Sequence, residues 1–97
     1  MNNKNKFEVF QYFLELYFFQ SYDWSELDKT TFDFRYSESY KKVALLEKEL
    51  NSLQKLNDWD FVKEFVRKHA GRKYDKEKVK LMIDIILECL TDPNWDK

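Results

Sequence analysis

The chain has few residues of the kinds that break regular structure. Its 97 residues include one glycine, one proline, one cysteine and one histidine. A β-rich domain of this length needs more turn residues, so this scarcity predicts long helices joined by short polar loops. The single cysteine, Cys89, cannot close a disulfide within the chain, which is typical of a reducing compartment rather than of a small secreted domain.

The same scarcity argues against catalysis and against a bound metal. We expect His69 in the last turn of a helix, where its charge favours the carbonyl end of the helix dipole. Cys89 falls on an apolar helix face and is expected to pack as a small hydrophobe. The sequence has no Cys/His cluster for zinc, no calcium loop and no Gly-rich phosphate loop. We therefore expect a protein that is not an enzyme and that needs no metal and no cofactor.

An excess of charge is missing too, and so is a long hydrophobic run. Lysine and arginine number 17 against 18 acidic residues, a formal net charge of −1. Direct nucleic-acid binding usually requires a basic excess, so no nucleic-acid partner is expected. Glu8, Gln11 and Glu15 interrupt the apolar stretch near the N-terminus. It therefore does not match a signal peptide or a membrane span, and we expect a cytoplasmic protein with no membrane partner.

Aromatic residues are abundant, at 19% of the chain within a hydrophobic total of 43%. This supply suffices for one modest core, and residues 1–97 fit a single domain. The spacing of apolar positions predicts an all-α fold, a compact antiparallel bundle of about four main helices. The first has only a narrow polar stripe and should be the central, mostly buried element. The predicted helices cover residues 4–20, 38–56, 59–70 and 76–90.

Several helix ends carry recognisable cap residues. Ser37 or Ser39 is suited to begin the second helix, Asp58 the third and Asp75 the fourth. Gly71 follows the third helix, where a left-handed residue is expected. Along the second helix, Val43, Leu46, Leu50 and Leu53 form an apolar seam that could pack internally or against a second copy. Along the third, the predicted inner face consists of Phe61, Val62, Phe65 and Val66.

Residues 21–38 break the helical pattern and combine acids with aromatics. The alternation over residues 31–36 predicts an irregular or extended segment after the first helix, with an extra turn near Trp24. Aromatics supply contact area at low entropic cost, and carboxylates steer a basic partner, so this acidic, aromatic region is a candidate recognition surface. The alternative is that the aromatics close the core and the acids are solvated. The candidate contact residues are Tyr22, Asp23, Trp24, Glu26, Asp28, Asp33, Tyr36 and Glu38.

The segment Leu16-Tyr17-Phe18-Phe19-Gln20-Ser21-Tyr22-Asp23-Trp24 resembles a signature of one family. An aromatic helix that ends in a Tyr-Phe pair, followed by Gln, Asp and Trp, is similar to immunity proteins of bacterial contact-dependent growth inhibition systems (the CdiI type). A leucine-rich helix and a shorter helix follow in the same order. The resemblance implies that the chain binds a toxin domain delivered by a neighbouring cell and blocks it. Such toxins are often nucleases with basic clefts, which carboxylates would suit.

The leading hypothesis is therefore a toxin-neutralising immunity protein whose partner is a cognate toxin domain, acting as a monomer or a weak dimer. The alternative is a helical adaptor or regulatory subunit of a bacterial complex with no toxin involved. A small enzyme or a nucleic-acid binder is the third hypothesis, and composition gives it little support.

Overall fold

The computed structural model describes residues 6–19 and 24–93, and within these residues it is helical with no strand. The predicted all-α fold is confirmed. The elements are α1 (Glu8–Phe13), the π-helical turn η1 (Leu14–Phe18), the 3-10 turn η2 (Trp24–Glu26), α2 (Leu27–Ser37), α3 (Tyr40–Leu56), α4 (Trp59–Ala70) and α5 (Lys76–Thr91). In the part of the chain that the structure describes, no helix combines the length and the hydrophobicity that crossing a bilayer requires.

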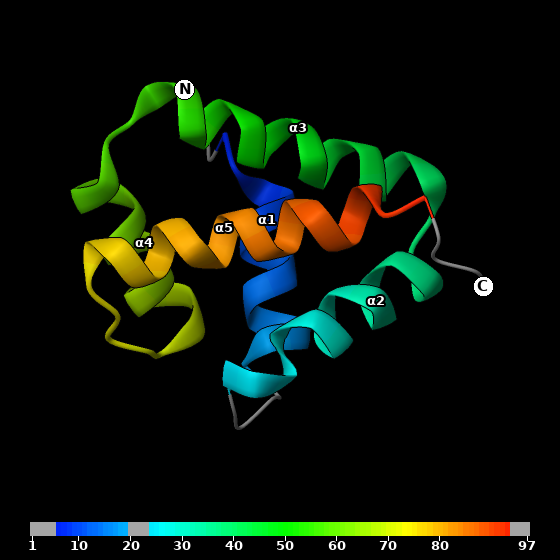
Figure 1. The fold of residues 1–97 in the computed structure, drawn as a ribbon, viewed down its shortest axis with the longest axis horizontal. Helices are drawn as coiled ribbons and strands as arrows, with labels where there is room; N and C mark the ends of the chain where they lie inside the picture. The colour runs from blue at the N-terminus through cyan, green and yellow to red at the C-terminus, as the bar shows by residue number, and fades with distance from the viewer. Residues whose placement is uncertain (1–5, 20–23, 94–97) are drawn as a thin grey trace.

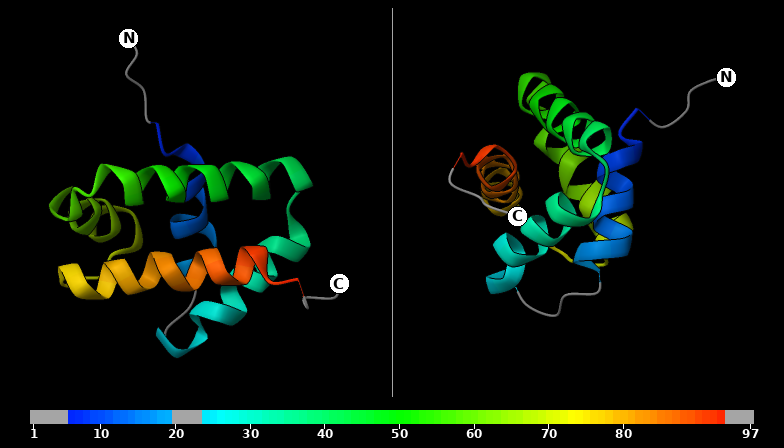
Figure 2. Two further views of the ribbon diagram at one scale, coloured as in Figure 1. Left: turned by 45° about the horizontal axis from the view of Figure 1, so that its top comes forward. Right: turned by 90° about the vertical axis from the view of Figure 1, so that its right-hand side faces the viewer.

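The helices pack around α1. Helices α3 and α5 run in opposite directions, and α1 crosses behind α5 in the view of Figure 1. Figure 2 places α1 and α5 on opposite sides of the molecule, with α2 and α3 between them. Helix α5 contacts α2, α3 and α4, so every helix after α1 meets it. This arrangement encloses one core.

The core contains the largest apolar side chains of α1 and η1. Phe10, Phe13, Leu14 and Phe18 are fully buried, which agrees with the prediction that the first helix is central. Burial is less complete than predicted, because Leu16 is 52% exposed. The π-helical hydrogen bond from the backbone N–H of residue 19 to the carbonyl of Leu14, 2.8 Å long, widens the helix here.

Local capping chemistry defines the ends of the later helices as predicted. Ser39 Oγ accepts a hydrogen bond from the Lys42 N–H at 3.1 Å, and Asp58 and Asp75 cap α4 and α5 in the same way. Gly71 ends α4 with φ 69°, the left-handed conformation that glycine adopts without steric cost. Three residues of the apolar seam of α3, Leu46, Leu50 and Leu53, are buried within the chain, and Val43 is half-buried.

One helix is capped from elsewhere in the sequence. The backbone N–H groups of Val9 and Phe10 donate to the two carboxylate oxygens of Glu49 on α3, at 3.2 and 2.9 Å. Burial raises the pKa of Glu49, Glu8 raises it further, and the two backbone hydrogen bonds oppose that rise. Glu49 thus supplies the acceptors that the first turn of α1 lacks, because Phe7 at the N-cap position offers none.

The prediction of an irregular segment over residues 21–38 is wrong for residues 27–37, because these residues form α2. Its buried positions are Leu27, Thr30, Thr31 and Phe34, a helical spacing of three and four residues. Two of the four are threonines, so the sequence does not show the apolar spacing that normally marks a buried helix face. The Thr31 hydroxyl donates to the Leu27 carbonyl at 2.8 Å, which satisfies its polar group inside the helix. The extra turn predicted near Trp24 is present as η2.

Candidate functional site

Helix α2 separates the acids that the sequence assigned to one surface. Glu26, Asp33 and Tyr36 lie along its outer stripe with Lys29, whose ammonium group is 3.8 Å from the Asp33 carboxylate. Tyr36 is 60% exposed on this stripe. Asp28 lies on a different side of α2, in a groove beside α5. The predicted residues Tyr22 and Asp23 lie outside the described residues.

Glu38 holds α2 against α1. Its carboxylate accepts hydrogen bonds from the hydroxyl groups of Tyr12 at 2.8 Å and Tyr17 at 2.5 Å. Burial of Glu38 acts to raise its pKa, but the bonds from the two tyrosines and the nearby Lys42 outweigh burial, so the pKa lies below the usual value. The Glu38 carboxylate is engaged within the fold, and we do not include it in the candidate site.

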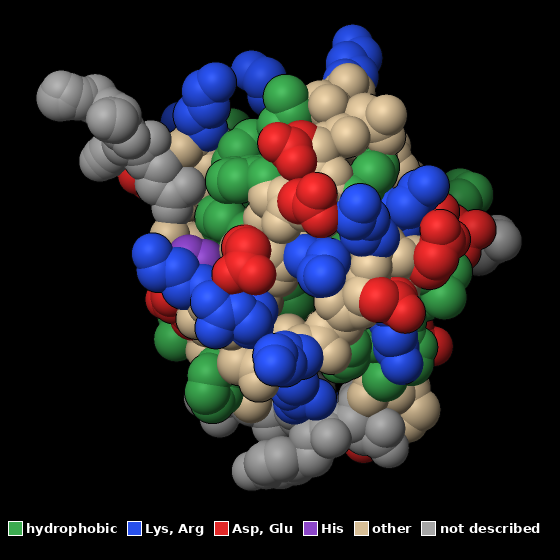
Figure 3. Space-filling model, turned by 90° about the vertical axis from the view of Figure 1, so that its left-hand side faces the viewer, with side chains coloured by type: hydrophobic (Ala, Val, Ile, Leu, Met, Phe, Trp, Pro, Cys, Tyr) green, Lys and Arg blue, Asp and Glu red, His purple; other side chains and the backbone are tan. Residues whose placement is uncertain are grey.

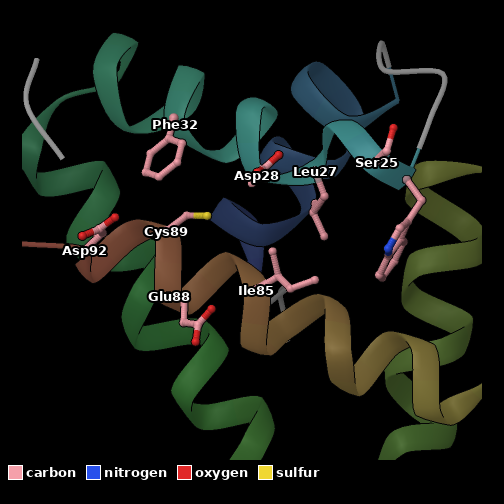
Figure 4. A pocket seen from close by; sticks show the side chains of 9 residues that line it. Ser25, Leu27, Asp28, Phe32, Ile85, Glu88, Cys89 and Asp92 are labelled. Atoms are coloured by element: carbon pink, nitrogen blue, oxygen red, sulfur yellow. The ribbon is translucent and has the colours of Figure 1, made fainter. Parts of the chain in front are cut away.

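A groove between α2 and α5 is the candidate site, and Figure 4 looks into it. Asp28 and Phe32 reach into it from α2, and Ile85, Cys89 and Asp92 from α5. The groove has a volume of about 440 Å³. Its floor is apolar, and its rim carries three carboxylates. The lining residues are Trp24, Ser25, Leu27, Asp28, Phe32, Ile85, Glu88, Cys89 and Asp92.

Trp24 stands at one end of this groove, and neighbouring side chains fix its ring. The ring packs edge-on against Tyr74, with 5.2 Å between the centroids. The Lys78 ammonium group lies 4.7 Å from the centre of the Trp24 ring, a cation–π distance. Trp24 remains half-buried, so part of it still faces the solvent. It is therefore a partly preorganised aromatic contact for a partner.

Arg35 connects α2 to the end of α5. Its guanidinium donates to the backbone carbonyls of Cys89 at 2.8 Å and Asp92 at 3.1 Å. These carbonyls belong to the C-terminal end of α5, where a positive charge is favoured by the helix dipole. The contact fixes the spacing of the two helices beside the groove.

The pKa of Cys89 reports the electrostatics of the groove. Burial, together with the carboxylates of Asp28, Glu88 and Asp92 and against the opposing charge of Arg35, raises this pKa to about 11. The Cys89 thiol is therefore protonated at neutral pH, as its predicted packing role requires. Among the described residues, no group of His, Cys, Asp and Glu side chains is arranged to hold a metal ion.

Comparison with known proteins finds no matching family model, no matching curated protein and no matching solved structure. The resemblance to immunity proteins therefore stays a prediction, and the chemistry of the groove has to be argued from its own residues.

The half of the groove that α5 supplies was not predicted. Ile85, Glu88, Cys89 and Asp92 are spaced by three and four residues, so they share one stripe of α5. On α2, Asp28 and Phe32 form a matching pair four residues apart. The α5 stripe was visible in the sequence, but its partner became visible only once residues 27–37 were known to be helical.

The other candidate reactive residue, His69, is not among the residues that line this groove and is mostly buried. Its Nδ1 atom is 2.7 Å from a carboxylate oxygen of Glu15, and its ring centroid is 4.6 Å from that of Phe65. The His69 side chain is only 13% exposed. It thus joins the last turn of α4 to η1, a more buried position than the capping role predicted.

Proposed function

We propose that the chain is an immunity protein that binds a cognate toxin domain through the groove between α2 and α5 and thereby neutralises it. The observation that carries this proposal is the combination of three carboxylates, on Asp28, Glu88 and Asp92, with an apolar floor in one recess. A partner that presents lysine or arginine fits both the carboxylates and the apolar floor. The charged head group meets the carboxylates, and the aliphatic stem packs on Phe32 and Ile85.

The anchoring of Trp24 supports the same partner. A tryptophan at the end of an acidic groove adds a large contact area with few side-chain rotations to restrict, a combination common at energetically important interface positions. Because Tyr74 and Lys78 already restrain the ring, little further ordering is needed when a partner binds. A basic nuclease cleft, which normally grips phosphates, offers the complementary charges. The protein would block such a toxin without chemistry of its own.

The class of function is tested by co-expression. The tagged chain is produced together with the protein encoded immediately upstream, and the bound material is identified after purification. We expect a stoichiometric complex with a domain that is lethal when produced alone. A neighbour that neither binds nor is toxic would contradict the proposal and favour the helical adaptor.

The binding surface is tested by a matched pair of charge reversals on one helix. Asp28→Lys places a positive charge in the groove, and Asp33→Lys places the same charge on the outer stripe of α2. We expect Asp28→Lys to weaken toxin binding at least tenfold, about 1.4 kcal/mol. Asp33→Lys should mainly slow association and should lose this effect at high salt. If the two changes affected the dissociation rate equally, the toxin would not bind through the groove.

A further inference from the structure

A second surface, on α1 and α4, has the opposite charge. Three phenylalanines form its centre, and we name Phe7, Phe61 and Phe65 the phenylalanine triangle. Their ring centroids are 5.8 Å apart for Phe7 and Phe61, 6.2 Å for Phe7 and Phe65, and 5.8 Å for Phe61 and Phe65. Phe65 also stacks on the buried Phe10 at 5.4 Å, which joins the triangle to the core.

Within residues 6–19 and 24–93, the packing leaves the phenylalanine triangle partly exposed. Phe61 was predicted on the inner face of its helix, but Val62 and Val66 occupy that face and Phe61 is 39% exposed. The triangle lies in a groove of about 740 Å³. A partly exposed aromatic group of this kind, joined to the core and rimmed by charges, is typical of interaction sites. The residues lining the groove are Lys6, Phe7, Gln11, Phe61, Glu64, Phe65, Arg67, Lys68 and His69.

Three basic side chains, Lys6, Arg67 and Lys68, line this groove with one acid, Glu64. Residues 63–73 contain five lysines or arginines and a single acid, Glu64. The hydrogen bond from Arg67 lowers the pKa of Glu64, and Arg67, Lys63 and Lys73 lower it further by their charges. Lys68 is exposed at the rim, where it also lies near the carbonyl end of α4. Figure 3 shows the end of the molecule formed by α4, where lysine and arginine side chains lie among acidic ones.

We propose that this groove binds an acidic polypeptide segment that carries apolar side chains. Carboxylates of the segment would pair with Arg67 and Lys68, and its apolar side chains would cover the phenylalanine triangle. The charge favours an acidic ligand, and the rings favour a polypeptide over RNA. Phe65 has one face covered by Phe10, and the His69 ring lies 4.6 Å from it, so its faces are not offered to a base.

This inference does not depend on the toxin proposal. The α2/α5 groove is acidic and calls for a basic partner, whereas the triangle lies on α1 and α4 and calls for an acidic one. Loss of toxin binding in groove variants and loss of acidic-peptide binding in triangle variants are therefore separate results.

The test uses a short fluorescent peptide in which leucine and glutamate repeat at helical spacing, with binding followed by anisotropy. Two further probes are a peptide of equal charge with serine in place of leucine and an oligouridine RNA. We expect saturable, salt-sensitive binding of the leucine peptide alone. Absence of binding would overturn the proposal, and so would equal binding of the serine peptide or of the RNA.

Two variants and one control locate the binding. Phe61→Ser removes an exposed ring, and Lys68→Glu reverses a rim charge without touching the core; each should weaken peptide binding at least tenfold. Lys55→Glu makes the same charge change in the last turn of α3 and should leave the affinity unaltered. Thermal melts check that each variant is folded. Folded Phe61→Ser and Lys68→Glu proteins that bind as tightly as the parent would refute the assignment.

Discussion

The aromatic residues of α2 provide a direct test of this helix. Phe32, Phe34 and Tyr36 alternate along the sequence, so an extended segment would place all three on one face with similar burial. In a helix the three point in different directions. Phe34 is fully buried, Phe32 is half-buried in the α2/α5 groove and Tyr36 is 60% exposed. Changing each of them to alanine should therefore give three different losses of stability.

The expected magnitudes follow from these contacts. The Phe34 ring is fully buried and packs edge-on against Phe13 and Tyr17, with centroids 5.4 and 5.1 Å away. Phe34→Ala should cost about 3–5 kcal/mol, the usual loss for a fully buried phenylalanine. Tyr36→Ala should change the free energy of unfolding by no more than about 0.5 kcal/mol, as most surface substitutions do. Phe32→Ala should fall between the two values.

The assay is urea unfolding of the three variants, followed by far-ultraviolet circular dichroism. A shift of the midpoint at constant slope measures the change in the free energy of unfolding. A folded domain of this kind is stable by about 5–15 kcal/mol, so Phe34→Ala should remove a large part of the total. Equal losses for Phe32→Ala, Phe34→Ala and Tyr36→Ala would refute the helix and restore the extended segment.

Three further predictions concern single groups. Because the pKa of Glu38 is lower in the folded protein than in the unfolded chain, its carboxylate stabilises the fold above the unfolded pKa, and this stability is lost as the pH falls through the folded pKa. The free energy of unfolding should therefore fall less between pH 7 and pH 3 for Glu38→Gln than for the parent. Gly71→Ala should cost about 1 kcal/mol in the same assay, because alanine is strained at φ 69°. Alkylation of Cys89 in the folded protein should stay slow until the pH approaches 11, whereas the urea-unfolded chain should react near pH 9.

Local signals account for the part of the fold that the sequence predicted. Ser39, Asp58, Asp75 and Gly71 act on neighbouring backbone groups, so their roles are visible within a few residues. Helix α2 has no such signal, since Glu26 at its N-cap position makes no side-chain cap and two threonines occupy its core face. Tertiary packing against α1 and α5 decides its conformation, and a single sequence does not display that packing.

The candidate site also has a part that local sequence signals predict and a part that depends on tertiary packing. Trp24 and Asp28 were predicted, because acids and aromatics concentrate around them in the sequence. Glu88 and Asp92 were not, since they come within reach of Asp28 only after α5 packs on α2. Phe61 was assigned to the core by periodicity alone, which cannot tell a buried ring from one at the edge of the buried stripe.

The cap that Glu49 provides for α1 has a consequence for synthesis of the chain on the ribosome. Helix α1 leaves the ribosome first, but its capping carboxylate follows about 40 residues later, so at 5–20 residues per second the wait is roughly 2–8 s. The core partner of α1 on α4, Phe65, emerges later still. During this interval the most aromatic stretch of the protein has no cap, and of its packing partners only α2 has been made. The nascent chain is then at its most prone to aggregation and most in need of a chaperone.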